Sequence, residues 1–289
     1  MKISHFRDFF KKELQEEYPK GEVGSFFNIL AEEYLGMSRL EMALNPHKEI
    51  SVEIRGKFEN ALQRLKDQEP IQHIVGETAF FGLTFKVNRH VLIPRPETEE
   101  LVAWILEAVS EEMQKEIRIL DIGTGSGCIA ISLAKNLPQA KISAIDVSPE
   151  ALKMAKSNAI LNGVKINFIQ QDILEMKALQ ERYDVIVSNP PYVRELEKKE
   201  MQKNVLEHEP ASALYVKDED PLIFYQKITS LAQKSLNPGG FLFFEINQYL
   251  SAETESILKA ENFTTHLKKD IFGNDRMLQG TLKISGDEN

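Results

Sequence analysis

From about residue 117 onward, short apolar stretches alternate with helical patterns, and this alternation limits the possible folds more than any other feature of the chain. The sequence predicts strands over residues 117–122, 141–146, 166–170, 183–188 and 241–246, and helices over residues 128–137, 148–161 and 221–236. Such alternation is typical of an α/β fold, in which a mostly parallel sheet carries helices on both faces. The last 25 or so residues predict two further strands, which a tight connection would make antiparallel.

The first 70 or so residues predict a small helical bundle. Apolar side chains recur there at spacings of three and four, with Lys and Glu between them, first at Phe6, Phe9, Phe10 and Leu14. Ser38 predicts the start of a short helix, because a serine hydroxyl can accept from a free backbone N–H of the first turn. Because residues 1–73 contain no cluster of catalytic residue types, we expect them to form an N-terminal helical domain that binds the substrate.

Residues 74–93 predict a β-hairpin that links this bundle to the main domain. Phe85 and Val87 alternate with polar neighbours, and Gly82 lies at the expected turn. The main domain is expected over residues 94–289, and its first helix over about residues 98–113.

Composition narrows the class of protein. The 289 residues include 35 Lys and Arg against 44 Asp and Glu, a net charge of −9 that argues against a non-specific nucleic-acid binder. Cys128 is the one cysteine, which excludes an internal disulfide and a cysteine-rich zinc site and favours a packing role, and the six histidines are scattered, so no metal is expected. No run approaches 18 apolar residues and residues 1–20 lack the apolar core of a signal peptide, so we expect a cytoplasmic protein.

A glycine-rich loop over residues 120–127 follows the first strand of the main domain and opens the next helix. Its three glycines permit a sharp turn and let a ligand approach bare backbone. The third glycine falls one position too early for the dinucleotide fingerprint, because Cys128 stands where that pattern needs glycine. Asp121, two positions before Gly123, would repel a pyrophosphate but suits a ligand with an ammonium group, such as S-adenosylmethionine.

Acidic residues at the ends of the next two strands support a nucleoside cofactor. Asp146 can accept hydrogen bonds from both ribose hydroxyls, and Asp172 can accept from the adenine amine while Ile173 covers the ring. We therefore expect S-adenosylmethionine as the cofactor, bound by Asp121, Gly123, Thr124, Gly125, Ser126, Gly127, Asp146, Asp172, Ile173 and Asn189.

The run Asn189-Pro190-Pro191-Tyr192 follows the strand over residues 183–188 and has the residue types that methylation of a planar nitrogen needs. An amide or aryl amine nitrogen is a poor nucleophile because its lone pair is delocalised. Acceptors on its two N–H bonds, here the Asn189 side chain and the Pro190 carbonyl, favour the pyramidal form that can attack. The prolines stiffen the loop and Tyr192 offers a flat face, so Asn189, Pro190 and Tyr192 are the expected catalytic residues and Pro191 completes the substrate site.

These motifs resemble those of a known family. The glycine loop is similar to that of class I S-adenosylmethionine-dependent methyltransferases, and Asn-Pro-Pro-Tyr is similar to the motif of amino and amide N-methyltransferases. Over about residues 70–280 the chain resembles the release-factor glutamine N5-methyltransferases, the HemK/PrmC family, through residues 70–76, 91–99, 209–210, 213–214, 238–240, 245 and 270–276. The resemblance implies a Rossmann-like domain with a mostly parallel seven-stranded sheet behind a helical N-terminal domain.

The resemblance also implies a substrate. This is the glutamine in the Gly-Gly-Gln loop of class 1 peptide chain release factors, methylated on its side-chain amide nitrogen, with S-adenosylhomocysteine as the second product. It assigns residues 189–192 to the glutamine site and places Arg95, Glu97 and Thr98 at the border of the cofactor. The chain departs from the family pattern over residues 215–221 and at Leu250, which leaves the shape of those loops open. We expect a monomer that binds release factors but neither membrane nor nucleic acid.

Other functions stay open. A DNA adenine N6-methyltransferase uses the same tetrapeptide on an exocyclic amine, although it needs a basic groove for a flipped base. Another protein or amine N-methyltransferase, or an adapter that binds cofactor without turnover, would keep the same fold. The charged residues 194–209 are interpreted as a solvated helix, with a lid ordered by the bound substrate as the alternative.

Overall fold

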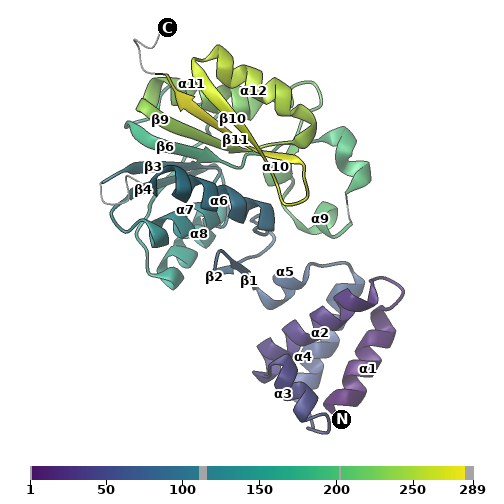
Figure 1. Ribbon diagram of the computed structural model, residues 1–289. Coiled ribbons are helices and arrows are strands. Elements are labelled where there is room, and N and C mark those ends of the chain that lie inside the picture. The colour runs from purple at the N-terminus through teal and green to yellow at the C-terminus, as the bar shows by residue number, and fades with distance from the viewer. Residues whose placement is uncertain (1, 111–115, 202, 284–289) are drawn as a thin grey trace. The chain divides into compact units, whose positions relative to one another are not determined.

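The computed structural model describes residues 2–110, 116–201 and 203–283. The chain divides into two compact units, and most of their helices and strands are labelled in Figure 1. The first contains the residues up to Gly76 together with the short helix α9 (Lys203–His208), and the second begins at Glu77. Residues 77–93, expected as part of a linker, therefore belong to the second unit.

The first unit is a helical bundle, as the apolar spacing predicts. Its helices before α9 are α1 (Ile3–Leu14), α2 (Lys20–Leu35), α3 (Arg39–Leu44), α4 (Val52–Lys66) and α5 (Ile71–Val75). In its core, the Phe58 ring stacks on Phe27 with centroids 5.5 Å apart and meets Phe6 edge-on at 5.3 Å. Ser38 and Glu41 form a capping box that starts α3, so the predicted helix start is confirmed.

The second unit is built on a seven-stranded sheet, as the resemblance implies. Its strands, in spatial order, are β10 (Phe263–Lys269), β11 (Asp275–Leu282), β9 (Leu236–Glu245), β6 (Tyr183–Ser188), β3 (Arg118–Ile122), β4 (Lys141–Asp146) and β5 (Asn167–Gln170). The five strands from β9 to β5 pair in parallel, and β11 and β10 add two antiparallel pairings. The predicted mixed sheet is confirmed.

Helices cover both faces of this sheet, because alternate strand residues point to opposite sides. Ile119, Val185 and Phe243 pack with residues of α6 (Pro96–Ala108), α7 (Cys128–Asn136) and α8 (Pro149–Asn162). Leu120, Ile186 and Phe244 pack with residues of α11 (Ile223–Ser235) and α12 (Ser251–Ala260). The two apolar cores fix the sheet in position and leave the carboxyl ends of its strands for a site.

A buried asparagine joins the hairpin to the main domain. The hairpin strands β1 (Glu77–Phe80) and β2 (Leu83–Lys86) pair antiparallel. Asn158 on α8 accepts from the Lys86 N–H at 2.7 Å and donates to the Lys86 carbonyl at 3.0 Å. Its amide also donates to the Ser126 carbonyl at 2.9 Å, and the residue is fully buried. One side chain therefore links β2, α8 and the glycine loop.

Most described residues of the charged segment over residues 194–209 are exposed or half-buried, but the segment is not one continuous helix and two of its acids are buried, so the interpretation as a solvated helix is only partly right. It contains part of β7 (Val193–Arg194), a 3₁₀ helix η2 (Glu195–Glu200) and α9, and beyond it lie α10 (Ala211–Leu214) and β8 (Tyr215–Val216). Glu197 and Glu209 are buried, because Arg194 and Asn247 donate to Glu197, and Arg95 and the Ile93 N–H donate to Glu209. These partners lie far along the chain, except Arg194, and the charge pattern does not reveal them.

Other elements were not predicted. Helices α5 and α12 and the 3₁₀ turn η3 (Gln248–Leu250) are among them. The main-domain helix expected over about residues 98–113 begins earlier, at Pro96, and also ends earlier, at Ala108. Residues 111–113 of the expected range lie outside the described residues. Within the described ranges, no helix is long and apolar enough to cross a membrane.

The Asn158 contacts lead to the first prediction. Replacing Asn158 by Ala should lower the free energy of unfolding by about 2–4 kcal/mol, because it leaves buried backbone groups of the hairpin and the glycine loop without partners. The matched control is Asn162→Ala, which removes the bond to the Thr84 carbonyl at the exposed end of the same helix and should cost less than about 1 kcal/mol. Urea unfolding of both variants measures the difference. Equal losses would contradict the role given to Asn158.

Candidate active site

A cavity of about 270 Å³ lies in the second unit at the carboxyl ends of the central strands. It is lined by residues from the glycine loop, the ends of β4 and β6, the turn after β5, and helices α10 and α11. Of the residues singled out from the sequence as site residues, those on its wall are Arg95, Thr98, Gly123, Thr124, Gly125, Ser126, Asp146, Asp172, Ile173, Asn189, Pro190 and Pro191. Glu97, Asp121, Gly127 and Tyr192 do not line it.

The three glycines of the loop meet different needs, although each has a positive φ, at +75°, +55° and +84°. At Gly125 an added Cβ would meet nothing within 4 Å, so the left-handed backbone beside open space is what requires glycine there. At Gly127 a Cβ would lie 2.9 Å from the Ile131 side chain and 3.2 Å from Ala155, so close packing of α7 on α8 disfavours a side chain in addition to the left-handed backbone. Gly125 therefore keeps the cavity wall free of a side chain, and Gly127 allows α7 and α8 to pack closely behind that wall.

Asp146 holds the loop and faces the cavity. Its Oδ2 accepts from the Gly125 N–H and its Oδ1 from the Ser148 N–H, both at 2.9 Å. Burial raises the pKa of Asp146, while these backbone donors lower it. Each carboxylate oxygen has a second lone pair, so Asp146 can still accept from a vicinal diol. The other predicted acid, Asp172, accepts from the Leu174 N–H at 2.9 Å and lines the cavity beside Ile173.

Asp121 lies beneath the loop and has no exposed surface. Thr124 Oγ1 donates to its Oδ2 at 2.6 Å, whereas its Oδ1 has no hydrogen-bond partner among the described residues. The pKa of Asp121 is raised to about 7: burial is the main cause and the nearby Asp146 adds to it, while the Thr124 hydroxyl and the Ala130 backbone oppose it. The sequence placed a carboxylate here correctly, but its side chain points into the core behind the loop.

The Asn189–Tyr192 run begins where β6 ends. Ser188 Oγ donates to the Ile122 carbonyl at 2.7 Å and ties the end of β6 to β3. Asn189 Nδ2 lies 3.5 Å from Thr98 Oγ1, and no described residue donates to Asn189 Oδ1. Because Oδ1 is not among the buried unpartnered atoms, it is open to a ligand in the cavity.

Sequence reasoning missed the contacts that support this loop. Tyr192 donates to the buried Glu245 at 3.0 Å, and Thr98 donates to the other oxygen of the same carboxylate at 2.6 Å. Burial raises the pKa of Glu245, while the two hydroxyl donors and the guanidinium of Arg276 lower it. Glu245 and Thr98 were singled out only through the family resemblance, and no pattern along the chain joins them, since they are 147 positions apart.

The rest of the cavity wall is mostly apolar. Leu92, Phe224 and Ile228 lie there, and so does Cys128. Burial raises the pKa of the Cys128 thiol to about 12, so it is protonated and packs as a small apolar group, as predicted. Among the described residues, no group of His, Cys, Asp or Glu has the arrangement of a metal site.

This wall fits S-adenosylmethionine by the chemistry of its groups. The ligand carries an ammonium, a sulfonium, a ribose diol and an adenine ring. The cavity offers the partly buried Asp146, the exposed edge of the glycine loop and the apolar Ile173, and an orphaned carboxylate oxygen of Asp121 lies behind the loop. Carboxylates and apolar side chains on one wall match these groups.

Comparisons with known proteins agree with this geometry. Residues 8–76 match the family described as PrmC N-terminal domain, and residues 102–216 match the family described as Methyltransferase small domain. A protein of Flavobacterium psychrophilum named Release factor glutamine methyltransferase is 53% identical over 96% of this chain and 99% of its own length. A protein of the same name from Bacteroides thetaiotaomicron is 44% identical over 93% and 96%. A solved methyltransferase structure from Pyrococcus furiosus shares the fold, with a TM-score of 0.53 and 17% identity over 81% of this chain and 100% of that one.

The burial of Asp121 leads to a prediction about pH. Because its pKa of about 7 in the folded state lies above the ordinary 3.8, the folded chain binds this proton more tightly than the unfolded chain. This group therefore makes the wild type less stable as pH rises from about 4 to 7. Asp121→Asn removes this titrating group. The free energy of unfolding of the variant minus that of the wild type should therefore increase between pH 5 and 7, by on the order of 2 kcal/mol, and then stay constant. Urea unfolding at pH 5, 7 and 8.5 measures this, and a difference that does not change with pH would contradict it.

Proposed function

The chain belongs to the family of release factor glutamine methyltransferases, and from this premise we propose how its own residues perform the reaction. It is an S-adenosylmethionine-dependent methyltransferase that modifies the side-chain amide nitrogen of a release factor glutamine. The target is the glutamine of the Gly-Gly-Gln motif of class 1 release factors. The observation that carries the assignment of the site is the open Asn189 Oδ1 on the wall of a cavity shared with the glycine loop.

Asn189 and Pro190 hold the glutamine. The Asn189 Oδ1 and the Pro190 carbonyl accept from its two amide N–H bonds, which fixes the nitrogen and favours its pyramidal form. Pro190 and Pro191 restrict the backbone, so these acceptors are oriented before the substrate binds. Tyr192 is anchored by Glu245 and supports the loop from its far end. The proton that the nitrogen loses on methylation passes to water.

The glycine loop and the strand-end acids hold the cofactor. When bound, S-adenosylmethionine supplies a methyl carbon activated by its sulfonium and remains as S-adenosylhomocysteine after transfer. The Gly123–Gly127 backbone and Asp121 serve its amino acid end, with Asp121 acting through its negative potential from behind the loop. Asp146 accepts from the ribose hydroxyls, and Asp172 and Ile173 contact the adenine. Asn189 borders both ligands.

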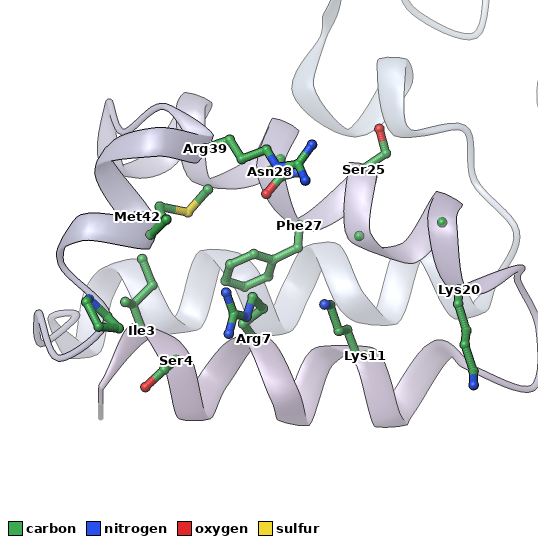
Figure 2. Close-up of a pocket in the computed structure, with 14 residues that line it drawn as sticks. Ile3, Ser4, Arg7, Lys11, Lys20, Ser25, Phe27, Asn28, Arg39 and Met42 are labelled. Atoms are coloured by element: carbon green, nitrogen blue, oxygen red, sulfur yellow. The ribbon is translucent and has the colours of Figure 1, made fainter.

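The first unit serves as the N-terminal substrate-binding domain. A cavity of about 620 Å³ lies between α1, α2 and α3, and no acidic residue of the described chain lines it. Figure 2 shows Arg7, Lys11 and Arg39 extending toward the space between these helices, while Lys20 at its edge points away. Arg7 Nε has no hydrogen-bond partner and forms one long ion pair with Asp8, at 3.7 Å. Lys11 and Arg39 form no ion pair within the described ranges. In a chain of net charge −9, this local excess of cations suits acidic side chains of the protein substrate.

The location, oligomeric state and partners that we propose follow from the choice of a release factor as the substrate. Release factors act in the cytoplasm, so the enzyme works there, as a monomer and without contact to nucleic acid. The net charge of −9 supports this over a DNA adenine methyltransferase, which needs a basic groove. The open acceptor Asn189 Oδ1 supports a catalytic protein over an adapter.

A methyl-transfer assay with labelled S-adenosylmethionine tests the function. The substrates are a purified release factor and its Gly-Gly-Gln→Gly-Gly-Ala variant. Label on the first and none on the second is expected. Label on both would move the target to another residue, and label on neither with cofactor bound would move the substrate to another amide or amine, with duplex DNA tested next.

Two variants should separate the substrate site from the cofactor site. Asn189→Ala removes one acceptor for the amide, so kcat should fall by about 100-fold or more, while the dissociation constant of S-adenosylmethionine changes little. Asp146→Ala should do the reverse and weaken cofactor binding by about tenfold or more. Steady-state kinetics and isothermal titration calorimetry measure both. Unchanged kcat in Asn189→Ala would contradict the role proposed for Asn189.

The cationic cavity of the first unit generates a prediction of its own. The double variant Lys11→Glu, Arg39→Glu should raise KM for the release factor by about tenfold and leave kcat and cofactor affinity unchanged. The control Lys12→Glu, Lys57→Glu changes the charge by the same amount at exposed positions outside the cavity and should leave KM near the wild-type value. Kinetics at two salt concentrations provide the measurement, because the effect should shrink at high salt. Equal effects of the two double variants would contradict a specific role for the cavity.

A further inference from the structure

We infer that Thr98, held by Glu245, is a positioning residue that decides which way the Asn189 side-chain amide faces. An amide has an acceptor oxygen and a donor nitrogen of nearly equal size, so the cavity wall alone does not select between its two orientations. The proposed function needs the oxygen to face the substrate. This inference rests on the proposed function and extends it to the residues behind the loop.

The contacts form a short chain from the core to the cavity. Thr98 on α6 and Glu245 at the end of β9 are both buried, with exposed fractions of 3% and 2%. Thr98 Oγ1 lies 2.6 Å from Glu245 Oε2, which is a strong hydrogen bond to a carboxylate. Asn189 Nδ2 lies 3.5 Å from the same Thr98 Oγ1.

The orientation of Asn189 follows from counting protons. A threonine hydroxyl has one hydrogen, and the Thr98 hydrogen is directed to the carboxylate of Glu245, which only accepts when ionised. Toward Asn189 the hydroxyl therefore presents a lone pair. A lone pair attracts the donor nitrogen of the amide and repels its oxygen, so Nδ2 faces Thr98 and Oδ1 is left for the cavity.

The same carboxylate holds the other end of the loop. Tyr192 donates to Glu245 Oε1 at 3.0 Å, and Asn247 Nδ2 donates to the Tyr192 carbonyl at 3.0 Å. Tyr225 donates to the Glu245 carbonyl at 3.2 Å and fixes the backbone of the anchor itself. Both ends of the Asn189–Tyr192 run are therefore held by the Glu245 carboxylate. Tyr192 contacts it directly, and Asn189 contacts it through Thr98.

Three variants test the inference in the full-length protein. Thr98→Val keeps the shape but removes the hydroxyl, so the amide loses its preferred orientation and kcat for the release factor should fall by about 10- to 100-fold. Thr98→Ser restores the hydroxyl and should recover most of this loss. The control Thr229→Val removes a buried threonine hydroxyl that has no hydrogen-bond partner and lies outside the cavity, and it should leave kcat unchanged. For all three, cofactor affinity should stay close to the wild type. Thr98→Val should also unfold at a lower temperature, because the buried Glu245 carboxylate loses a donor, whereas Thr98→Ser and Thr229→Val should unfold near the wild-type temperature.

Glu245→Gln tests the coupling. Its effect on kcat should be smaller in the Thr98→Val background than in the wild type, because the path from Glu245 to Asn189 is already broken there. Independent effects of the two substitutions, or equal losses in Thr98→Val and Thr98→Ser, would overturn the inference.

A measurement without substrate separates this inference from the proposed function. The Asn189 side-chain NH₂ resonances, assigned by comparison with Asn189→Ala, should shift in Thr98→Val and return in Thr98→Ser. If the wild type fails to methylate release factors but these shifts occur, the orientation holds and the substrate assignment fails. If methylation occurs but Thr98→Val leaves the resonances and kcat unchanged, the positioning role is wrong.

Discussion

The site depends on the parallel pairing of β3 with β4 on one side and β6 on the other. Ile122 at the end of β3 lies opposite Ile145 in one neighbour and Ser188 in the other, so the chain leaves all three strands at one level. The glycine loop, Asp146 and Asn189 come directly at or after these ends. If any one strand ran in the opposite direction, its loop would lie at the other edge of the sheet. The topology therefore brings the functional residues together before any side-chain contact is made.

Much of this could be predicted because it is encoded locally. Apolar runs set the strands, and a strand end followed by glycine or an acid shows where a ligand can approach. The environment of Asp121, in contrast, could not be predicted from local sequence. It lies within β3, next to Leu120 and Ile122, and alternation along a strand turns its side chain toward the opposite face from theirs. The carboxylate was therefore predicted at the right position in the chain, but its complete burial followed only from the helices packed on that face.

The contacts that could not be predicted join residues far apart in the chain. Glu209 is buried because Arg95, 114 positions earlier, pairs with it, and Glu197 because Asn247, 50 positions later, donates to it. Both acids lie in a run whose composition is typical of a solvated surface. A charged side chain can be buried when a partner compensates its desolvation, and the partner's identity is a property of the fold rather than of the neighbouring sequence.

The electrostatics of the cavity reconcile two opposing needs. Burial raises the pKa values of Asp121 and Asp146, so their charged forms are disfavoured in the free protein. A cationic ligand nearby offsets that cost, and by linkage the same interaction lowers both pKa values and strengthens binding. Methyl transfer, however, removes the positive charge of the sulfonium, so negative charge close to the reacting atoms would oppose it. Asp121 and Asp146 lie at and behind the glycine loop, whereas the Asn189–Tyr192 run carries no charged side chain and meets the substrate with neutral acceptors. The Glu245 carboxylate behind this run is separated from Asn189 by the Thr98 hydroxyl and accepts from Thr98 and Tyr192. Separating charge for binding from neutral dipoles for reaction lets one cavity satisfy both requirements.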